Sequence, residues 1–187
     1  WVKDKLSKKL KVFLKNKNID VIYSNIYLYH EKKKIKKIFI KGELNFGKFT
    51  QKLVNKFELP ILSTLIKRKV FNQIKFDERY TIIGDLDFFV RLSLIKSFTA
   101  VQEPLAYYRI HESNLTKKRI DLNIKELQIW VSERVKDKKF NLINFSKIYL
   151  LIEILKIQKN IIEGNKLKVF LGILKRPIDV LKIKFLD

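Results

Sequence analysis

Apolar residues recur along this chain with two different spacings. Apolar positions three or four residues apart are typical of an amphipathic helix, and short apolar runs bounded by turn residues are typical of strands. Both patterns alternate before residue 120. The predicted helices cover residues 4–17, 49–57, 64–71 and 85–95, and the predicted strands cover residues 20–24, 98–101 and 105–110, with a hairpin over residues 26–40.

After residue 120 the pattern is helical. Helices are predicted over residues 121–138, 145–162 and 165–174, and Pro177 stops the last one because proline lacks a backbone N–H. The sequence therefore predicts an α/β domain over residues 1–119 and a helical extension over residues 120–187. Its longest apolar run falls far short of the ~20 residues that span a bilayer.

The chain is strongly basic, with a formal net charge of +22. Only seven of its 41 basic residues are arginine, the residue best suited to reading base edges and gripping phosphates. The lysines are spread along a chain that is also rich in Ile, Asn and Phe. We interpret the charge as compositional bias with a solvated surface, rather than as a nucleic-acid footprint, although a basic surface also suits anionic lipid or a polyanionic substrate.

Two missing residue types also limit the interpretation. The chain has no cysteine, which excludes disulfides, thiolate metal sites and a cysteine nucleophile. It has no methionine and begins at Trp1, and we expect it to be part of a longer protein. Lysines interrupt the first residues, so these do not form the apolar core of a signal peptide.

One carboxylate is predicted at the start of a helix. Asp85 follows Gly84, and aspartate is among the best N-cap residues, so capping is the simpler interpretation of Asp85 taken alone. The helix dipole would also keep the carboxylate ionised, as a general base for a hydroxyl nucleophile requires. Asp87 precedes Arg91 by four residues, which predicts an ion pair on one helix face.

Two basic side chains are predicted on one side of a strand. In the run Glu103 to His111, alternation places Leu105, Tyr107, Arg109 and His111 on one side and Ala106, Tyr108 and Ile110 on the other, which we expect to be core. A guanidinium beside an imidazole can hold a diphosphate or a metal-bound phosphate. The alternative is a surface strand whose Arg109 pairs with a nearby acid such as Glu112.

Taken together, these segments resemble the C-terminal half of the catalytic domain of glycosyltransferase family 2, which has the GT-A fold. The resemblance implies part of that fold, a mixed sheet with flanking helices. The resemblance covers roughly residues 1–116, and no single motif decides it. Family motifs are matched by Phe76-Asp77-Glu78, by Gly84-Asp85-Leu86-Asp87 with Arg91-Leu92, by Glu103-Pro104-Leu105 with Tyr108-Arg109, His111, Asn114 and Thr116, and less strongly by Trp1, Lys5 and Leu6, Tyr23-Ser24, Leu59-Pro60 and residues 66–71.

The resemblance implies a hexosyltransferase that transfers a sugar with inversion of configuration at the anomeric carbon. An acceptor hydroxyl gives its proton to Asp85 and attacks the anomeric carbon, while the nucleoside diphosphate leaves with its charge held by a divalent metal, Mg or Mn. Arg109, His111 and Asp87 are then expected to bind substrate, with Arg109 and His111 neutralising the leaving diphosphate or helping to hold the metal. The implied partners are a nucleotide-sugar donor and a glycan or lipid-linked acceptor of bacterial surface polysaccharide synthesis, and the implied location is cytoplasmic, at the inner face of the plasma membrane.

The chain departs from the family pattern at two points. Gly84 occupies the place of a family glutamate, so the contribution of that carboxylate is absent or replaced. The acidic metal-binding motif and the nucleotide-binding half belong before Trp1 in the family. We therefore expect the isolated 187-residue chain to contain no metal site and to be inactive.

Three alternatives remain open. The C-terminal helices either pack back on the first domain or lie on an anionic membrane surface, because residues 167–174 carry an apolar stripe beside lysines. The whole chain could instead be a non-catalytic basic module that binds membrane or nucleic acid. A degenerate transferase retained as a partner subunit is the third alternative.

Overall fold

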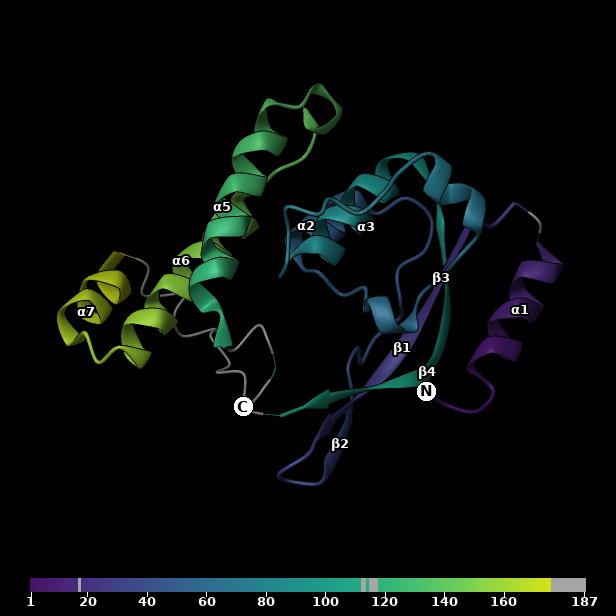
Figure 1. Cartoon of the computed structure of the whole chain (residues 1–187), viewed down its shortest axis with the longest axis horizontal. Coiled ribbons are helices and arrows are strands. Elements are labelled where there is room, and N and C mark those ends of the chain that lie inside the picture. The colour runs from purple at the N-terminus through teal and green to yellow at the C-terminus, as the bar shows by residue number, and fades with distance from the viewer. Residues whose placement is uncertain (17, 112–113, 115–117, 176–187) are drawn as a thin grey trace. The chain divides into compact units, whose positions relative to one another are not determined.

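The computed structural model describes residues 1–16, 18–111, 114 and 118–175 (Figure 1). It divides into two compact units, Trp1–Asn114 and Leu115–Asp187. The first unit is a mixed α/β structure and the second is helical over its described residues, as the sequence predicts. In the described part of the chain, no helix has the length and the apolar character that crossing a bilayer requires.

The first unit is organised around one buried strand, β1 (Val21–His30). It pairs antiparallel with β2 (Ile35–Ile38) and β3 (Leu65–Ile66), and parallel with β4 (Phe98–Ile110), which makes a four-stranded mixed sheet. The first six residues of β1 are buried, whereas its last four are half-buried. The strand therefore runs from the core outward, and its C-terminal end lies beside the C-terminal end of β4.

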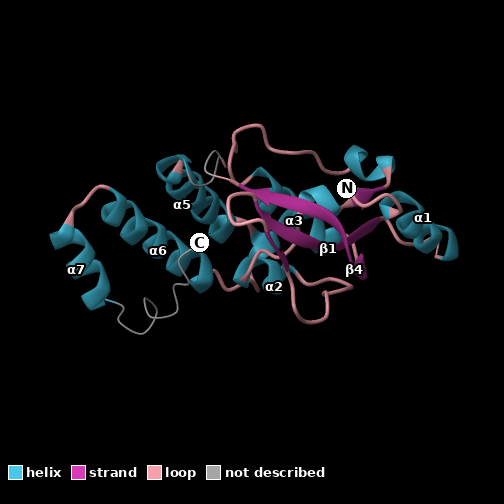
Figure 2. Cartoon of the chain, turned by 90° about the horizontal axis from the view of Figure 1, so that it is seen from below, coloured by secondary structure: helices cyan, strands magenta, loops and turns pink. Residues whose placement is uncertain are grey.

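Helices lie on both sides of this sheet. Helices α2 (Thr50–Asn55) and α3 (Gly84–Ile95) lie on one side, and α1 (Lys5–Lys15) lies on the other (Figures 1 and 2). An aromatic cluster joins α2 and α3 to the strands. The ring centroids of Phe49 and Phe98 are 5.3 Å apart, and those of Phe89 and Phe98 are 6.3 Å apart. This cluster fixes α3 against the start of β4.

Three predicted elements differ from the structure. The helix predicted over residues 64–71 is wrong, since this segment forms β3 and then the 3₁₀ turn η2 (Arg68–Asn72). The strand predicted over residues 20–24 continues without a break to His30 before the hairpin turn. The two strands predicted around Pro104 are one strand, and its register against β1 shifts near Asn25, which lies opposite Pro104.

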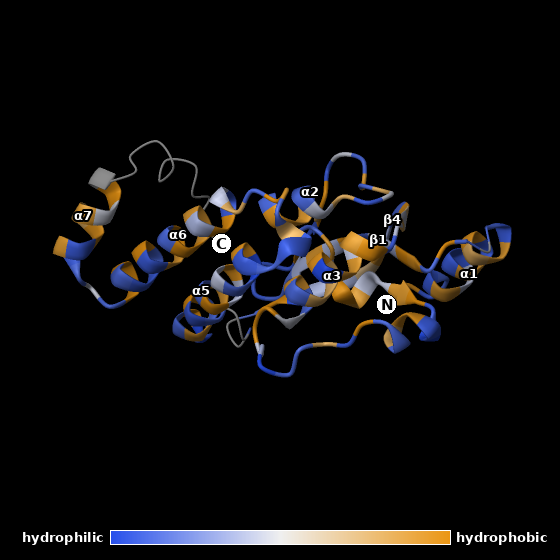
Figure 3. Ribbon diagram, turned by 90° about the horizontal axis from the view of Figure 1, so that it is seen from above, coloured by the Kyte–Doolittle hydropathy of each residue, from blue (hydrophilic) through white to orange (hydrophobic). Residues whose placement is uncertain are grey.

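Helix α1 buries two lysines and exposes several leucines. Its buried residues are Lys5 and Lys9, whereas Leu6 (57 %) and Leu14 (78 %) are exposed to solvent. The Lys5 Nζ donates a hydrogen bond to the carbonyl oxygen of Leu62, 2.6 Å away, in the 3₁₀ turn η1 (Ile61–Ser63). Figure 3 shows polar and apolar positions mixed along this helix. The predicted helix is therefore confirmed, but its apolar positions are divided, since the leucines are exposed whereas Val12 and Phe13 are half-buried beside the buried lysines.

The second unit contains α5 (Ile120–Lys136), the 3₁₀ turn η3 (Lys138–Phe140), α6 (Ser146–Ile162) and α7 (Lys166–Lys175). Its core includes the fully buried Trp130, whose ring meets Phe145 edge to face at 5.8 Å. Gly164 ends α6 with a φ of +69°, and the two backbone bonds of a Schellman motif form there. The predicted helix stop at Pro177 lies outside the described residues.

Candidate active site

Asp85 occupies the second position of α3 and does not cap it. The N-cap residue is Ile83, which provides no side-chain cap, so the capping interpretation of Asp85 is wrong. The Asp85 Oδ1 instead accepts a hydrogen bond from the backbone N–H of Leu86, 2.8 Å away. The carboxylate is half-buried at the first turn of the helix.

The ionisation of Asp85 also differs from the expectation based on the helix dipole. Burial raises its pKa above the ordinary value of 3.8, although hydrogen bonds from the backbone N–H groups of Leu86 and of Asp85 itself oppose this shift. Desolvation therefore outweighs the helix terminus here. A carboxylate with a raised pKa binds a proton more tightly, and this property suits a general base.

Asp87 forms a buried ion pair with Arg91. Its side chain is fully buried, and the Arg91 Nε donates to its Oδ1 at 3.0 Å and to its Oδ2 at 2.9 Å, which confirms the predicted ion pair. The same guanidinium donates to the carbonyl oxygen of Lys75, 2.9 Å away, in the loop before α3. This pair ties the first half of α3 to that loop. The substrate-binding role predicted for Asp87 stays a prediction.

Arg109 lies at the C-terminal end of β4, beside the end of β1. In the register of the two parallel strands it lies opposite Tyr29. Its side chain is 68 % exposed and forms an ion pair with Glu31 at 3.8 Å. The acid beside Arg109 among the described residues is therefore Glu31, on the neighbouring strand end, whereas Glu112 lies outside them.

His111 follows β4 directly and is half-buried. The Asn114 side chain forms two hydrogen bonds with this part of the backbone. Its Oδ1 accepts from the His111 backbone N–H at 2.7 Å, and its Nδ2 donates to the Arg109 carbonyl oxygen at 3.3 Å. The Asn114 side chain thus contacts the backbone of both Arg109 and His111. Thr116, which the resemblance also includes, lies outside the described residues.

The opposite side of β4 is not all core. Ala106 is buried as predicted, but Tyr108 is 37 % exposed and Ile110 is half-buried. The reason is that this part of β4 pairs with the outer, half-buried end of β1, beyond the six residues of β1 that the core buries. The strand end therefore presents side chains to solvent on both faces.

The structure brings the site residues together in two groups. Asp85 and Asp87 share the first turns of α3, and Arg109 and His111 share the end of β4. Asp85 makes no ion pair or hydrogen bond with either basic side chain in the described part of the chain. A substrate that touched both groups would have to bridge them.

The described residues do not provide the metal site that the family resemblance implies. No group of three or more Asp, Glu or His side chains comes together among them. Gly84, by contrast, leaves room for the family glutamate, because a Cβ added there would meet nothing within 4 Å. Because no such cluster occurs among the described residues, no catalytic step is assigned to a divalent cation.

Sequence reasoning missed two contacts between the ends of β1 and β4. Glu31 was hidden because it is 78 positions away in the sequence and the β1–β4 register alone brings it close. Tyr27 and Tyr107 stack across the same pair of strands with ring centroids 5.1 Å apart. Only the parallel pairing of β1 with β4 brings these residues together. The spacing of apolar residues does not reveal which strands pair, so the sequence pattern could not predict these contacts.

Comparison with known proteins relates this chain to a glycosyltransferase. No family model matches the sequence. The chain is 27 % identical over 107 residues to an uncharacterized glycosyltransferase of Methanocaldococcus jannaschii, an alignment that covers 57 % of this chain. It spans only 37 % of the length of that relative. The similarity supports a glycosyltransferase relationship and a mixed α/β fold compatible with part of such an enzyme.

Proposed function

We propose that this chain is the acceptor-activating part of an inverting glycosyltransferase of family 2, of hexosyltransferase type. The observation that carries the proposal is the half-buried Asp85 carboxylate at the start of α3, with a pKa raised by burial, in a chain similar to a glycosyltransferase. The Arg109 and His111 pair at the end of a parallel strand supports it. The C-terminal ends of parallel strands are the usual binding edge of α/β sheets.

The proposed reaction is a single displacement. The Asp85 carboxylate accepts the proton of an acceptor hydroxyl, and the hydroxyl oxygen forms a bond to the anomeric carbon of the donor sugar. The bond from that carbon to the nucleoside diphosphate breaks on the opposite face, which inverts the configuration. The electron pair leaves with the diphosphate.

The basic pair has an electrostatic role in this reaction. Arg109 and His111 neutralise charge that grows on the departing diphosphate, a contribution that is usually large in such reactions. The ion pair between Arg109 and Glu31 is long and exposed, so it is weak and a phosphate can replace it at little cost. The divalent metal expected for the family would be held by residues outside those described. Asp87 supports the site by holding Arg91 and the loop before α3.

The donor and acceptor belong to the proposal in general terms. The donor is a nucleotide sugar, and the acceptor is a hydroxyl of a glycan or lipid-linked glycan in bacterial surface polysaccharide synthesis. We place the enzyme in the cytoplasm, at the inner face of the plasma membrane. The sugar-transfer assays use the gene product that contains these 187 residues, because the chain spans little more than a third of its relative.

The proposal is tested by sugar transfer in the Asp85→Asn variant. Asparagine has the same shape as aspartate but accepts no proton, so turnover should fall by about 10²- to 10⁴-fold while circular dichroism stays unchanged. Glu163→Gln, at an exposed carboxylate of the second unit, is the matched control and should retain activity. Turnover of Asp85→Asn within a few-fold of wild type would refute the assignment of Asp85 as the general base.

A non-catalytic basic module is the second candidate function, and the lysine-rich turn between β1 and β2 favours it. In that case no nucleotide sugar is consumed by the wild-type gene product. Binding to an anionic partner would then weaken steeply with salt and would not respond to Asp85→Asn.

A further inference from the structure

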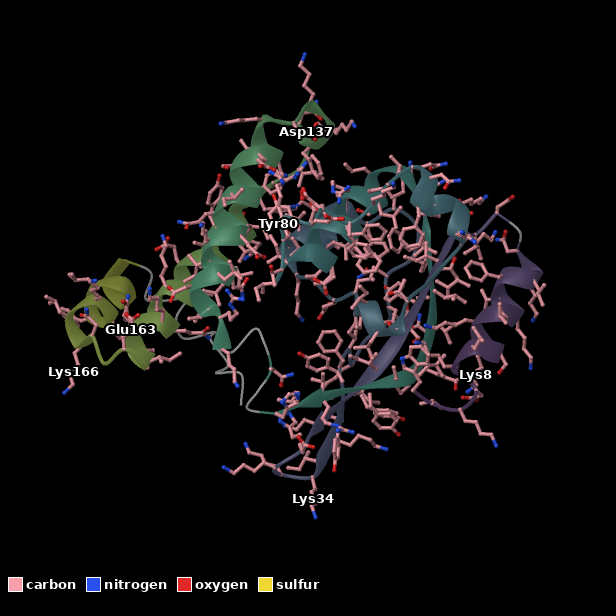
Figure 4. The ribbon with its side chains drawn as sticks, in the orientation of Figure 1. Lys8, Lys34, Tyr80, Asp137, Glu163 and Lys166 are labelled. Atoms are coloured by element: carbon pink, nitrogen blue, oxygen red, sulfur yellow. The ribbon has the colours of Figure 1, made fainter. Side chains whose placement is uncertain are left out.

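The turn that joins β1 to β2 carries the densest positive charge of the first unit. We define the lysine hairpin as residues 31–38, with the sequence EKKKIKKI, in which five of eight residues are lysine. All eight residues are exposed. The one acid of this segment, Glu31, forms a long, exposed ion pair with Arg109, and the segment keeps a net positive charge. Lys34 projects from the tip of the turn in Figure 4.

Apolar and aromatic side chains accompany these lysines. Ile35 is 43 % exposed and Ile38 is 48 % exposed, and on the adjoining end of β4 Tyr107 is 45 % exposed. The Lys36 ammonium lies 4.4 Å from the ring centroid of Tyr27. The hairpin thus carries lysines together with one exposed isoleucine on each face of β2. Such a mixture resembles a membrane-interface segment, since the apolar groups enter the headgroup region and the lysines meet its phosphates.

The charge extends beyond what an edge strand needs. Strand β2 pairs with β1 and lies at the edge of the described sheet, and lysines on an edge strand commonly prevent unwanted strand pairing. Lys36 and Lys37 meet that need. Lys32, Lys33 and Lys34 lie in the turn, before β2 begins, so edge protection does not account for them.

We propose that the lysine hairpin docks on an anionic lipid membrane surface. Charge complementarity supports this occupant, because each lysine near such a surface adds about 1 kcal/mol of attraction. The exposed aliphatic side chains and the use of lysine rather than arginine favour lipid over nucleic acid. The surface differs from the C-terminal helices, for which membrane contact was considered above, and it does not depend on the transferase assignment.

The lysine hairpin lies beside the strand ends that carry the candidate site residues Arg109 and His111. The last residues of β1 pair with β2 on one side and with β4 on the other, so Lys36 and Arg109 both lie opposite Tyr29. A membrane bound by the hairpin would therefore lie close to the strand ends that carry Arg109 and His111. Molecules in the headgroup region would be presented to that edge of the sheet.

The test is co-sedimentation of the 187-residue chain with vesicles at low ionic strength. The hairpin variant combines Lys32→Gln, Lys33→Gln, Lys34→Asn, Lys36→Gln and Lys37→Gln; asparagine is used at position 34 because this residue has a φ of 53°, a conformation that asparagine tolerates. The matched control replaces five exposed lysines of the second unit by glutamine and has the same net charge. These are Lys125, Lys136, Lys138, Lys139 and Lys147.

The wild-type chain should sediment with vesicles that contain phosphatidylglycerol, should not sediment with pure phosphatidylcholine vesicles, and should be released by salt. The hairpin variant should lose about tenfold or more in lipid affinity, and the control should stay within about twofold of wild type. Equal losses in both variants would show attraction by net charge alone and would overturn the proposal. So would a failure of the wild type to sediment, or tighter hairpin-dependent binding of a single-stranded oligonucleotide.

Discussion

Replacing Lys9, one of the two buried lysines of α1, by methionine should stabilise this protein at neutral pH. The Lys9 side chain is completely buried, and its Nζ has no hydrogen-bond partner in the described part of the chain. Burial, together with the nearby charge of Lys5, lowers the pKa of Lys9 from 10.5 to about 7. Methionine fills nearly the same volume without a charge, so the substitution removes the cost and keeps the packing.

The size of the effect follows from the two pKa values. Each pH unit between the folded and unfolded pKa corresponds to about 1.4 kcal/mol, so the buried ammonium costs up to about 5 kcal/mol. Relaxation of the long side chain toward water reduces this figure, and we expect a gain of about 2–4 kcal/mol in the free energy of unfolding. This is a substantial fraction of the ~5–15 kcal/mol that stabilises a typical domain.

The pH dependence has a definite sign. Below pH 7 or so Lys9 is protonated in both the folded and unfolded states, and its cost is complete. Between about 7 and 10.5 the unfolded chain binds more protons than the folded one, so wild-type stability rises with pH over this window. Lys5, whose pKa is also lowered by burial, acts in the same direction.

The assay is urea unfolding of wild type, Lys9→Met and Lys11→Met across the range from about pH 6 to pH 9. Lys11 is exposed on the same helix, and its replacement should change stability by less than about 0.5 kcal/mol. Lys9→Met should be more stable than wild type at pH 6 and should show a weaker dependence on pH. If the free energy of unfolding of the wild type does not change from pH 7 to pH 9, and Lys9→Met is no more stable, then Lys9 does not carry a destabilising buried charge.

Three other substitutions test the contacts around the site and in the second unit. Asp87→Asn leaves Arg91 without its charged partner and should lower the free energy of unfolding by about 2–4 kcal/mol in urea titrations; a loss below about 0.5 kcal/mol would contradict the buried pair. Gly164→Ala forces a side chain into a φ of +69° and should cost about 1 kcal/mol, measured as a lower melting temperature than that of wild type. Gly84→Glu enters open space at a helix start and should leave the melting temperature unchanged or slightly raised, so a marked drop would argue against this geometry.

The sequence was sufficient for elements whose pattern is local. The helix around Asp85 to Ile95 and the hairpin centred on residues 30–34 were predicted because apolar spacing and turn residues lie within a few positions of each other. The segment over residues 64–71 was misread because its strand character depends on pairing with Val21 and Ile22, far away in the chain. Local pattern does not report such a partner.

The candidate site shows the same limit. The sequence placed Asp85 at a helix start and Arg109 with His111 at a strand end, but the partners of these groups are set by tertiary structure. The contact between Arg109 and Glu31 depends on parallel strand pairing. The upward pKa shift of Asp85 depends on burial that a helix-dipole argument does not include. The inward lysines of α1 also contradict what amphipathicity alone suggests.

The most direct test of the proposed function is the pH dependence of kcat/KM for sugar transfer by the gene product that contains this chain. If Asp85 takes the proton of the acceptor, the rate should fall on acidification with a midpoint above 3.8, the ordinary pKa of aspartate. The residual rate of Asp85→Asn should lack that acidic limb. An identical acidic limb in both proteins would show that another group accepts the proton, and would contradict the account.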